Sequence, residues 1–102
     1  MTRIGDETVH GFLHGRASAI GTSAVQLVSA SSHLAKGVQL KAPQSNSGVV
    51  YVGTSGVTAD SADATDGFPL SGGEGLFVPI DDPSKLYVRG SAAGQKVFWF
   101  AI

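Results

Sequence analysis

Fourteen glycines are scattered along the 102 residues and divide the chain into short apolar runs, which restricts the folds open to it. Turn signals separate these runs roughly every ten residues, a spacing that predicts seven or eight short strands. No amphipathic helix of sufficient length stands out, and no helix-length connection separates the later runs. We therefore expect an all-β, single-domain antiparallel β-sandwich or a jelly-roll-like barrel.

Residues 37–42 show the clearest strand pattern, with apolar Val38, Leu40 and Ala42 alternating with polar Gln39 and Lys41. Residues 49–54 carry apolar side chains on both faces, which predicts a central strand. The other expected strands are residues 8–14, 24–29, 56–58, 76–80, 85–89 and 95–102. Turns are expected at residues 43–48, 70–75, 81–84 and 90–94, and a polar loop at 59–67.

The final run, Val97–Ile102, is the most hydrophobic of the chain, and no polar tail follows it. An exposed strand of this composition would aggregate, so we expect it to be buried inside the fold or against another subunit. Phe98 and Phe100 share one face and Trp99 lies on the other, which indicates a central strand or a subunit interface. The expected interface residues are Val97, Phe98, Trp99, Phe100 and Ile102, with His10, Phe12 and Leu13.

A chain of this length forms one domain. We expect residues 1–23 to be an extended N-terminal arm or an edge strand, and residues 24–102 to form the β-sandwich. The arm could reach a neighbouring subunit.

Charged residues make up only 15% of the chain, below the roughly 25% of an average soluble domain. Such a surface suits assembly, because few charges lose their water on contact. The net charge of −1 argues against nucleic acid as a partner. There is no cysteine, no apolar signal-peptide core near the N-terminus and no run approaching the ~18 apolar residues of a membrane span.

The best candidate for a metal site is the segment 60–67, in which Asp60, Asp63 and Asp66 recur at intervals of three. A calcium loop needs carboxylates at intervals of two and a later Glu, so a solvated loop is the favoured interpretation. His10 and His14 share a strand face but lack the Cys or carboxylate cluster of a metal site, and His33 stands alone.

No catalytic constellation is visible. None of the serines lies in a Gly-x-Ser-x-Gly elbow, the turn at residues 72–75 lacks the Lys of a phosphate loop, and no carboxylate pair faces a cleft. The aromatic residues could stack on bases or sugars, but among them only Lys96 supplies a positive charge, which favours the core or an interface. We expect a protein that is not an enzyme and has no cofactor.

From Val25 to Ile102 the chain resembles a group of small structural proteins of tailed bacteriophages. No single motif carries the resemblance, which lies in the order of the segments. They are Ala24–Leu27, Val38–Pro43, Val49–Gly53, Gly56–Thr58, Gly67–Leu70, Gly73–Glu74, Ile80–Pro83, Lys85–Val88 and Gly94–Val97.

The resemblance implies a β-sandwich protein of the virion; some members of the group are capsid decoration (cement) proteins or head fibres, often trimeric, and others are attached to tails. We expect a capsid decoration protein. Its partner would be the lattice of the major capsid protein, without nucleic acid or membrane contact, and the chain would be made in the host cytoplasm and reside on the capsid surface. Two alternatives remain open: a tail or neck component of the virion, and a carbohydrate-binding module.

Overall fold

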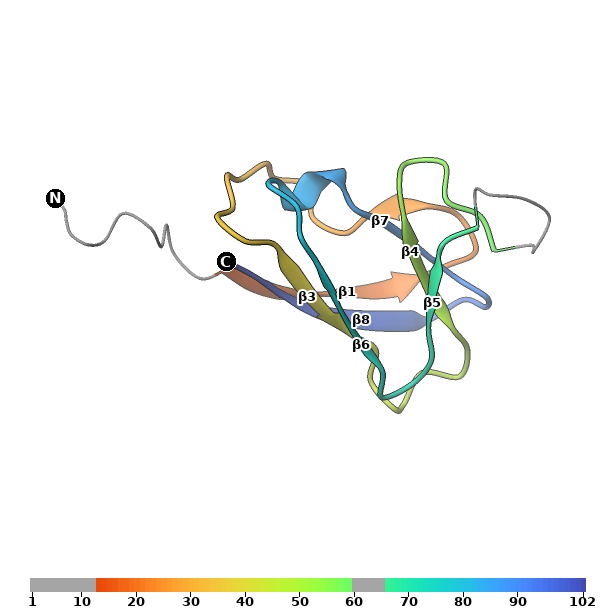
Figure 1. Cartoon of the computed structure of the whole chain (residues 1–102). Helices are drawn as coiled ribbons and strands as arrows, with labels where there is room; N and C mark the ends of the chain where they lie inside the picture. Colours follow the sequence, from red (N-terminus) through yellow and green to blue (C-terminus); the bar gives the residue numbers. More distant parts are fainter. Residues whose placement is uncertain (1–12, 60–65) are drawn as a thin grey trace, which may run out of the picture.

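The computed structural model describes residues 13–59 and 66–102 of the chain. They form two four-stranded sheets in which every pairing is antiparallel, confirming the predicted all-β antiparallel sandwich (Figure 1). In the first sheet the order is β1 (Leu13–Ile20), β8 (Gln95–Ala101), β3 (Val38–Lys41) and β6 (Gly75–Val78). In the second sheet it is β2 (Val25–Gln26), β7 (Tyr87–Gly90), β4 (Val50–Gly53) and β5 (Phe68–Leu70).

The core lies between the two sheets and is built by the alternation of each strand. The inward residues of β3 and β4, Val38, Leu40, Val50 and Val52, are buried, as is Val88 of β7. Their outward neighbours along each strand are more exposed, because successive side chains of a strand point to opposite faces. The predicted alternation of residues 37–42 and the central position of residues 49–54 are thus confirmed.

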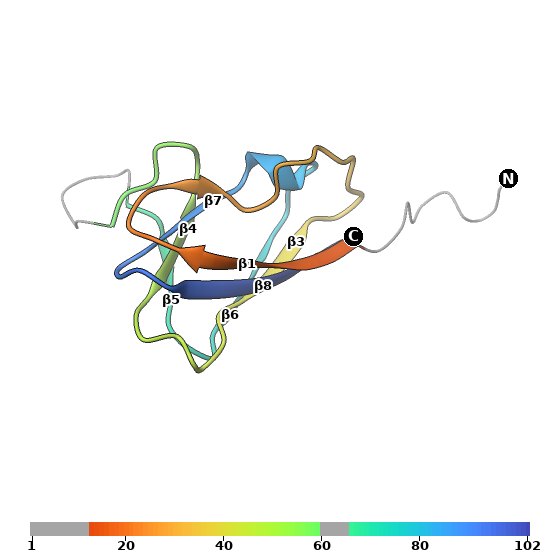
Figure 2. The ribbon, with the colours of Figure 1, turned by 180° about the vertical axis from the view of Figure 1, so that it is seen from behind.

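The C-terminal strand β8 occupies the middle of the first sheet, between β1 and β3 (Figure 2). Val97 and Ala101 are fully buried and Trp99 packs against the core. Phe98 and Phe100, however, are 45% and 37% exposed on the outer face. The central-strand interpretation is therefore confirmed, and the inward residues of β8 are buried inside the fold as expected. For the outward rings, burial against another subunit stays a prediction.

Strand β5 (Phe68–Leu70) lies outside the expected strands, and Pro69 is in its middle. Proline lacks the N–H that a ladder requires and is tolerated at the edge of a sheet. Among the named strands β5 pairs only with β4, at the edge of the second sheet. The expected strand at residues 24–29 shortens to β2, and the turn at 81–84 leads into a short 3₁₀ helix, η2 (Pro83–Lys85).

The N-terminal strand β1 pairs along its length with β8 at the edge of the first sheet. Its register shifts between Ala17 and Ile20, and Ala19 has a φ of 56°, as at a β-bulge. Residues 13–20, within the segment 1–23 expected to be an arm or an edge strand, are therefore an edge strand of the sandwich. Residues 1–12 lie outside the described residues.

Candidate functional site

The outer face of the first sheet gathers aromatic and polar side chains from four strands that are far apart in sequence. We call it the aromatic face and define it by the outward residues of these strands, which are His14, Arg16, Gln39, Lys41, Phe77, Lys96, Phe98 and Phe100. They point outward because they alternate with inward residues such as Val97 and Leu40. Phe77 is 43% exposed, so three phenyl rings are accessible on this face.

The strand register arranges these residues in two rows across the sheet. One row runs from His14 through Phe100 and Gln39 to Phe77. The next row runs from Arg16 through Phe98 to Lys41. Directly opposite residues on neighbouring strands have Cβ atoms ~5 Å apart, so each ring of β8 lies between two polar side chains.

A groove of about 490 Å³ lies along the centre of the aromatic face. Its lining residues come from β1, β3 and β8 and are His14, Gly15, Gln39, Leu40, Lys41, Phe98, Trp99 and Phe100. Gly15 is opposite Trp99, and a Cβ atom there would come within 3.0 Å of the indole ring. The missing side chain of Gly15 thus lets the Trp99 ring pack against β1 beneath the groove.

Three positively charged residues lie on the strands of the aromatic face, and two of them, Arg16 and Lys41, flank Phe98. Arg16, Lys41 and Lys96 lie on its strands, and the Arg16 guanidinium carbon is 6.0 Å from the centroid of the Phe98 ring. That separation is at the limit of a cation–π contact. The acidic residues of the described part of the chain, Asp66, Glu74, Asp81 and Asp82, all lie outside its named strands.

The expected interface residues divide between this face and the core. Phe98 and Phe100 lie together on the aromatic face, and Leu13, at the start of β1, is 38% exposed. Ile102 is half-buried and Trp99 points inward. Val97 is fully buried in the sandwich, so it is a core residue and not an interface residue. His10 and Phe12 lie outside the described residues.

Sequence reasoning missed Phe77, Arg16 and Lys41. Alternation along the expected strand 76–80 places Phe77 opposite the apolar face of Leu76 and Val78, and this signal could have identified it. Arg16 and Lys41 become neighbours of Phe98 only through strand pairing, which the local sequence does not encode.

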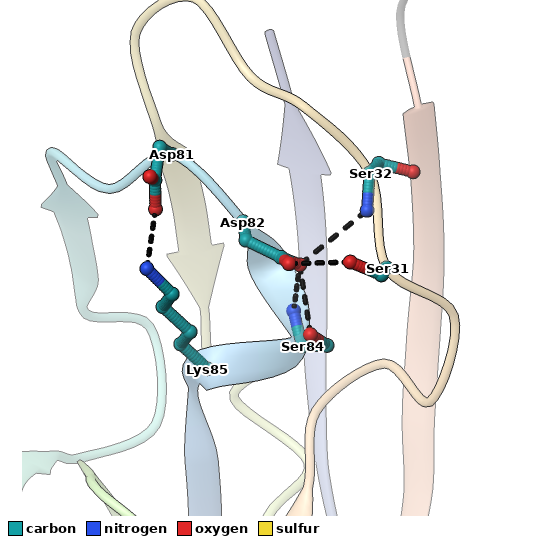
Figure 3. A network of polar contacts seen from close by, with 6 residues as sticks. All are labelled: Ser31, Ser32, Asp81, Asp82, Ser84 and Lys85. Atoms are coloured by element: carbon teal, nitrogen blue, oxygen red, sulfur yellow. Dashed lines mark hydrogen bonds and ion pairs between the residues drawn. The ribbon is translucent and has the colours of Figure 1, made fainter.

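Away from the aromatic face, a polar cluster surrounds η2 (Figure 3). Asp82 caps this 3₁₀ helix, accepting hydrogen bonds from the backbone N–H and the hydroxyl of Ser84 at 2.9 and 2.8 Å. Its other carboxylate oxygen accepts a 2.5 Å hydrogen bond from the Ser31 hydroxyl. Hydrogen bonds from Ser31 and Ser84 hold the pKa of the Asp82 carboxyl well below its usual value.

Beside this cap, the Lys85 ammonium lies 2.9 Å from the Asp81 carboxylate on the exposed surface. This contact lowers the pKa of Asp81 and raises that of Lys85. A small polar pocket of about 230 Å³ is lined by Ser31, Ser32, His33, Asp81, Asp82 and Lys85. The hydrogen bonds of Asp82 connect η2 to the loop that precedes β3, so this cluster has a structural role.

The candidate metal ligands are dispersed in the fold. Within residues 13–59 and 66–102, no three His, Cys, Asp or Glu side chains come together in a way that could hold an ion. His14 lies on the aromatic face and His33 beside the Asp82 cap. Asp66 accepts a 2.9 Å hydrogen bond from the Thr58 hydroxyl across an isolated bridge. Asp60 and Asp63 lie outside the described residues.

An apolar groove of about 490 Å³ opens between the sheets, where β6 faces β4 and β5. Its apolar lining includes Val52, Phe68, Leu76, Val78, Ile80 and Leu86. Phe68 is 58% exposed at its rim. In the part of the chain that the structure describes, no helix is long and apolar enough to cross a membrane.

Comparison with protein-family models, with curated proteins and with solved structures gave no match. The geometry of the aromatic face, together with the sequence, therefore carries the functional proposal.

Proposed function

We propose that this chain is a non-enzymatic structural protein of a virion, a capsid decoration protein that binds and stabilises the lattice of the major capsid protein. The observation that carries the proposal is the pair of exposed rings, Phe98 and Phe100, on the outer face of a central strand of the first sheet. The order of segments that resembles small phage structural proteins supports the same conclusion.

The proposed mechanism is the burial of this face against a repeated protein surface. Full burial of an exposed phenyl ring is worth about 1.5–3 kcal/mol, so partial burial of three rings contributes a few kcal/mol per copy. The rings lie on hydrogen-bonded strands, and a rigid sheet loses little conformational freedom on docking. Multiplied over many identical sites on a shell, a modest gain per copy resists outward pressure on the lattice.

A homotrimer is part of the proposal. The apolar groove between β6 and β4–β5 offers a contact between copies that differs from the aromatic face, which leaves that face available for the lattice. A head-to-tail contact of this kind closes into a ring when the rotation between copies allows it. Three aromatic faces on one particle would then bind the lattice with an avidity that a single face lacks.

The first test locates the protein on purified phage particles with a gold-labelled antibody in the electron microscope. Label spread over the heads is the expected result. Label confined to the tail or neck would retain a virion role and overturn the decoration role. Absence of label from all particles would overturn both.

A second test measures occupancy on the particles by quantitative gel analysis. The double variant Phe98→Ser/Phe100→Ser should fold and lose most of its occupancy, because it removes the rings that the lattice would cover. The matched control is Val25→Ser, since Val25 is 44% exposed on the second sheet. Equal occupancy of the two variants would contradict the assignment of this face.

The same rings favour one alternative of another class, a carbohydrate-binding module. Exposed aromatic faces beside hydrogen-bonding side chains are common features of sugar sites, and Phe100 lies beside Gln39. A glycan array with the wild-type chain separates the two functions. Binding that is lost in Phe98→Ser/Phe100→Ser, without label on virions, would favour the carbohydrate-binding module.

A further inference from the structure

Charge is distributed unevenly over this molecule, although its net charge is only −1. The aromatic face carries Arg16, Lys41 and Lys96, and its four strands contribute no acidic residue. The described acidic residues lie in the connections, with Asp81 and Asp82 engaged by Lys85, Ser31 and Ser84. The exposed rings are therefore set in a locally positive surface.

The cations are placed to act together with the rings. In the sheet register, Phe98 lies between Arg16 on β1 and Lys41 on β3. The Arg16 guanidinium extends over the Phe98 ring, and Lys41 lines the same central groove. An apolar group seated on Phe98 would thus have a positive charge on each side.

We infer that the surface bound by the aromatic face is an acidic patch of the capsid lattice, in which Asp or Glu carboxylates surround an apolar centre. This inference rests on the proposed decoration function and specifies the chemistry of its partner. The guanidinium of Arg16 can accept a carboxylate through two parallel hydrogen bonds, and the ammonium of Lys41 can pair with a second one. Rings that exclude water from the centre strengthen these ion pairs by lowering the local dielectric constant.

Charge complementarity also argues against two other occupants. A second copy joined face to face would oppose the same cations across the two-fold axis, and like charges in contact cost several kcal/mol. A nucleic acid would need a domain with a basic excess, whereas this chain has an isoelectric point of about 6.2. A local cluster of protein carboxylates matches three cations without requiring a positive molecule.

The test is co-sedimentation of the full chain with phage particles that lack it, at rising ionic strength from about 0.01 M to 1 M. Wild-type binding should weaken as salt screens the ion pairs. Arg16→Glu and Lys41→Glu should each weaken binding about tenfold or more. Lys36→Glu is the matched control, because it makes the same charge change at an exposed lysine outside the strands and should stay within about twofold.

Equal melting curves for all four proteins establish that folding is not the cause. If wild type binds, but salt and the two face variants have no more effect than the control, the inference is overturned and the proposed function stands. If wild type binds no particle, both fail. If wild type binds a labelled oligo-dT strand and the two face variants do not, the face binds nucleic acid. If the two face variants differ from wild type in oligomeric mass in solution, the face binds a second copy. Either result overturns the inference.

Discussion

At the residue scale, Gln95 is the buried polar side chain on which the C-terminal strand depends. It is completely buried at the start of β8. Its carbonyl oxygen accepts a 2.8 Å hydrogen bond from the Gly48 N–H, and its amide donates to the Ser47 hydroxyl and the Ala93 carbonyl at 3.0 Å. A single side chain thus forms hydrogen bonds to two turns, residues 43–48 and 90–94, which meet at the start of β8.

Replacing Gln95 by Leu should lower the free energy of unfolding by about 1–3 kcal/mol, because the Gly48 N–H loses its acceptor in a water-poor site. Chemical denaturation measures this loss. Gln39→Leu is the control, since Gln39 lies on the outer face, and its effect should stay within about 0.5 kcal/mol. Equal losses in both variants would show that the buried network has no special role.

The Asp82 cap makes the stability depend on pH. Its pKa in the folded chain is lowered from an ordinary 3.8 by the hydrogen bonds of Ser31 and Ser84. A carboxylate with a lowered folded pKa contributes stability above its unfolded pKa, and this contribution is lost as the pH falls through the folded pKa. The melting temperature should therefore fall more between pH 7 and about pH 2 in wild type than in Asp82→Asn.

Asparagine keeps the shape and the N-cap acceptor of Asp82 but does not titrate. Thermal melts followed by circular dichroism at both pH values test the prediction. Asp81→Asn serves as the control, because Asp81 pairs with Lys85 on the exposed surface, where ion pairs contribute little. Parallel acid profiles for wild type and Asp82→Asn would contradict the prediction.

At the scale of elements, two backbone hydrogen bonds join Gly37, just before β3, to Ile102, just after β8. Gly37 donates a hydrogen bond to the Ile102 carbonyl at 3.1 Å, and the Ile102 N–H donates to the Gly37 carbonyl at 3.0 Å. Gly37 has a φ of 153°, and a Cβ atom there would collide with the Val78 carbonyl oxygen. Glycine is therefore required where β3 meets both β8 and β6.

Gly37→Ala should cost about 1–3 kcal/mol from backbone strain alone, and the collision with Val78 adds to that loss. Gly21→Ala is the matched control, since nothing lies within 4 Å of a Cβ atom at that position. This control should be neutral or stabilise the fold by up to about 1 kcal/mol. Equilibrium unfolding of both variants decides, and equal stability would refute the conformational role of Gly37.

At the scale of the whole molecule, the chain passes between the two sheets at nearly every connection. Among the named strands, only β4 and β5 are consecutive in sequence and share a sheet. The first sheet combines β1 with β8, so its aromatic face needs both ends of the described chain. The face and the fold must therefore form together, and a variant that loses the fold also loses the face.

Deletion of residues 1–12 leaves every named strand in place, because β1 begins at Leu13. The truncated chain should melt within about 4 °C of wild type. Its occupancy on particles should be lower, because the N-terminal arm expected from the sequence would reach a neighbouring subunit. The cut must precede Leu13, since His14 pairs with Phe100 across β1 and β8. A truncated chain that fails to fold would contradict the first expectation, and undiminished occupancy the second.

The alternation of apolar residues and the spacing of turns were sufficient to predict the fold class. Both signals are local, because side-chain direction in a strand repeats every two residues and turns depend on a few adjacent residues. The strands within residues 37–42, 49–54 and 95–102 are predicted in this way, whereas the strand expected at 85–89 begins only at Tyr87, because Lys85 belongs to η2. Strand β5 could not be predicted from these signals, because Pro69 is compatible with a strand only at the edge of a sheet. Local sequence does not indicate which strands lie at an edge.

The candidate site was predictable only in part. The alternation within residues 97–102 separates Phe98 and Phe100 from Val97 and Trp99, but whether the rings are covered depends on what packs over the sheet. Local patterns in the sequence are enough to establish that the chain forms short antiparallel strands and that its last strand carries phenyl rings on one face. Alternation also marks Phe77 as an outward residue, but strand pairing in the folded chain is what places Phe77, Arg16 and Lys41 on the same face as these rings, because pairing and sheet order arise from contacts between residues far apart in the chain.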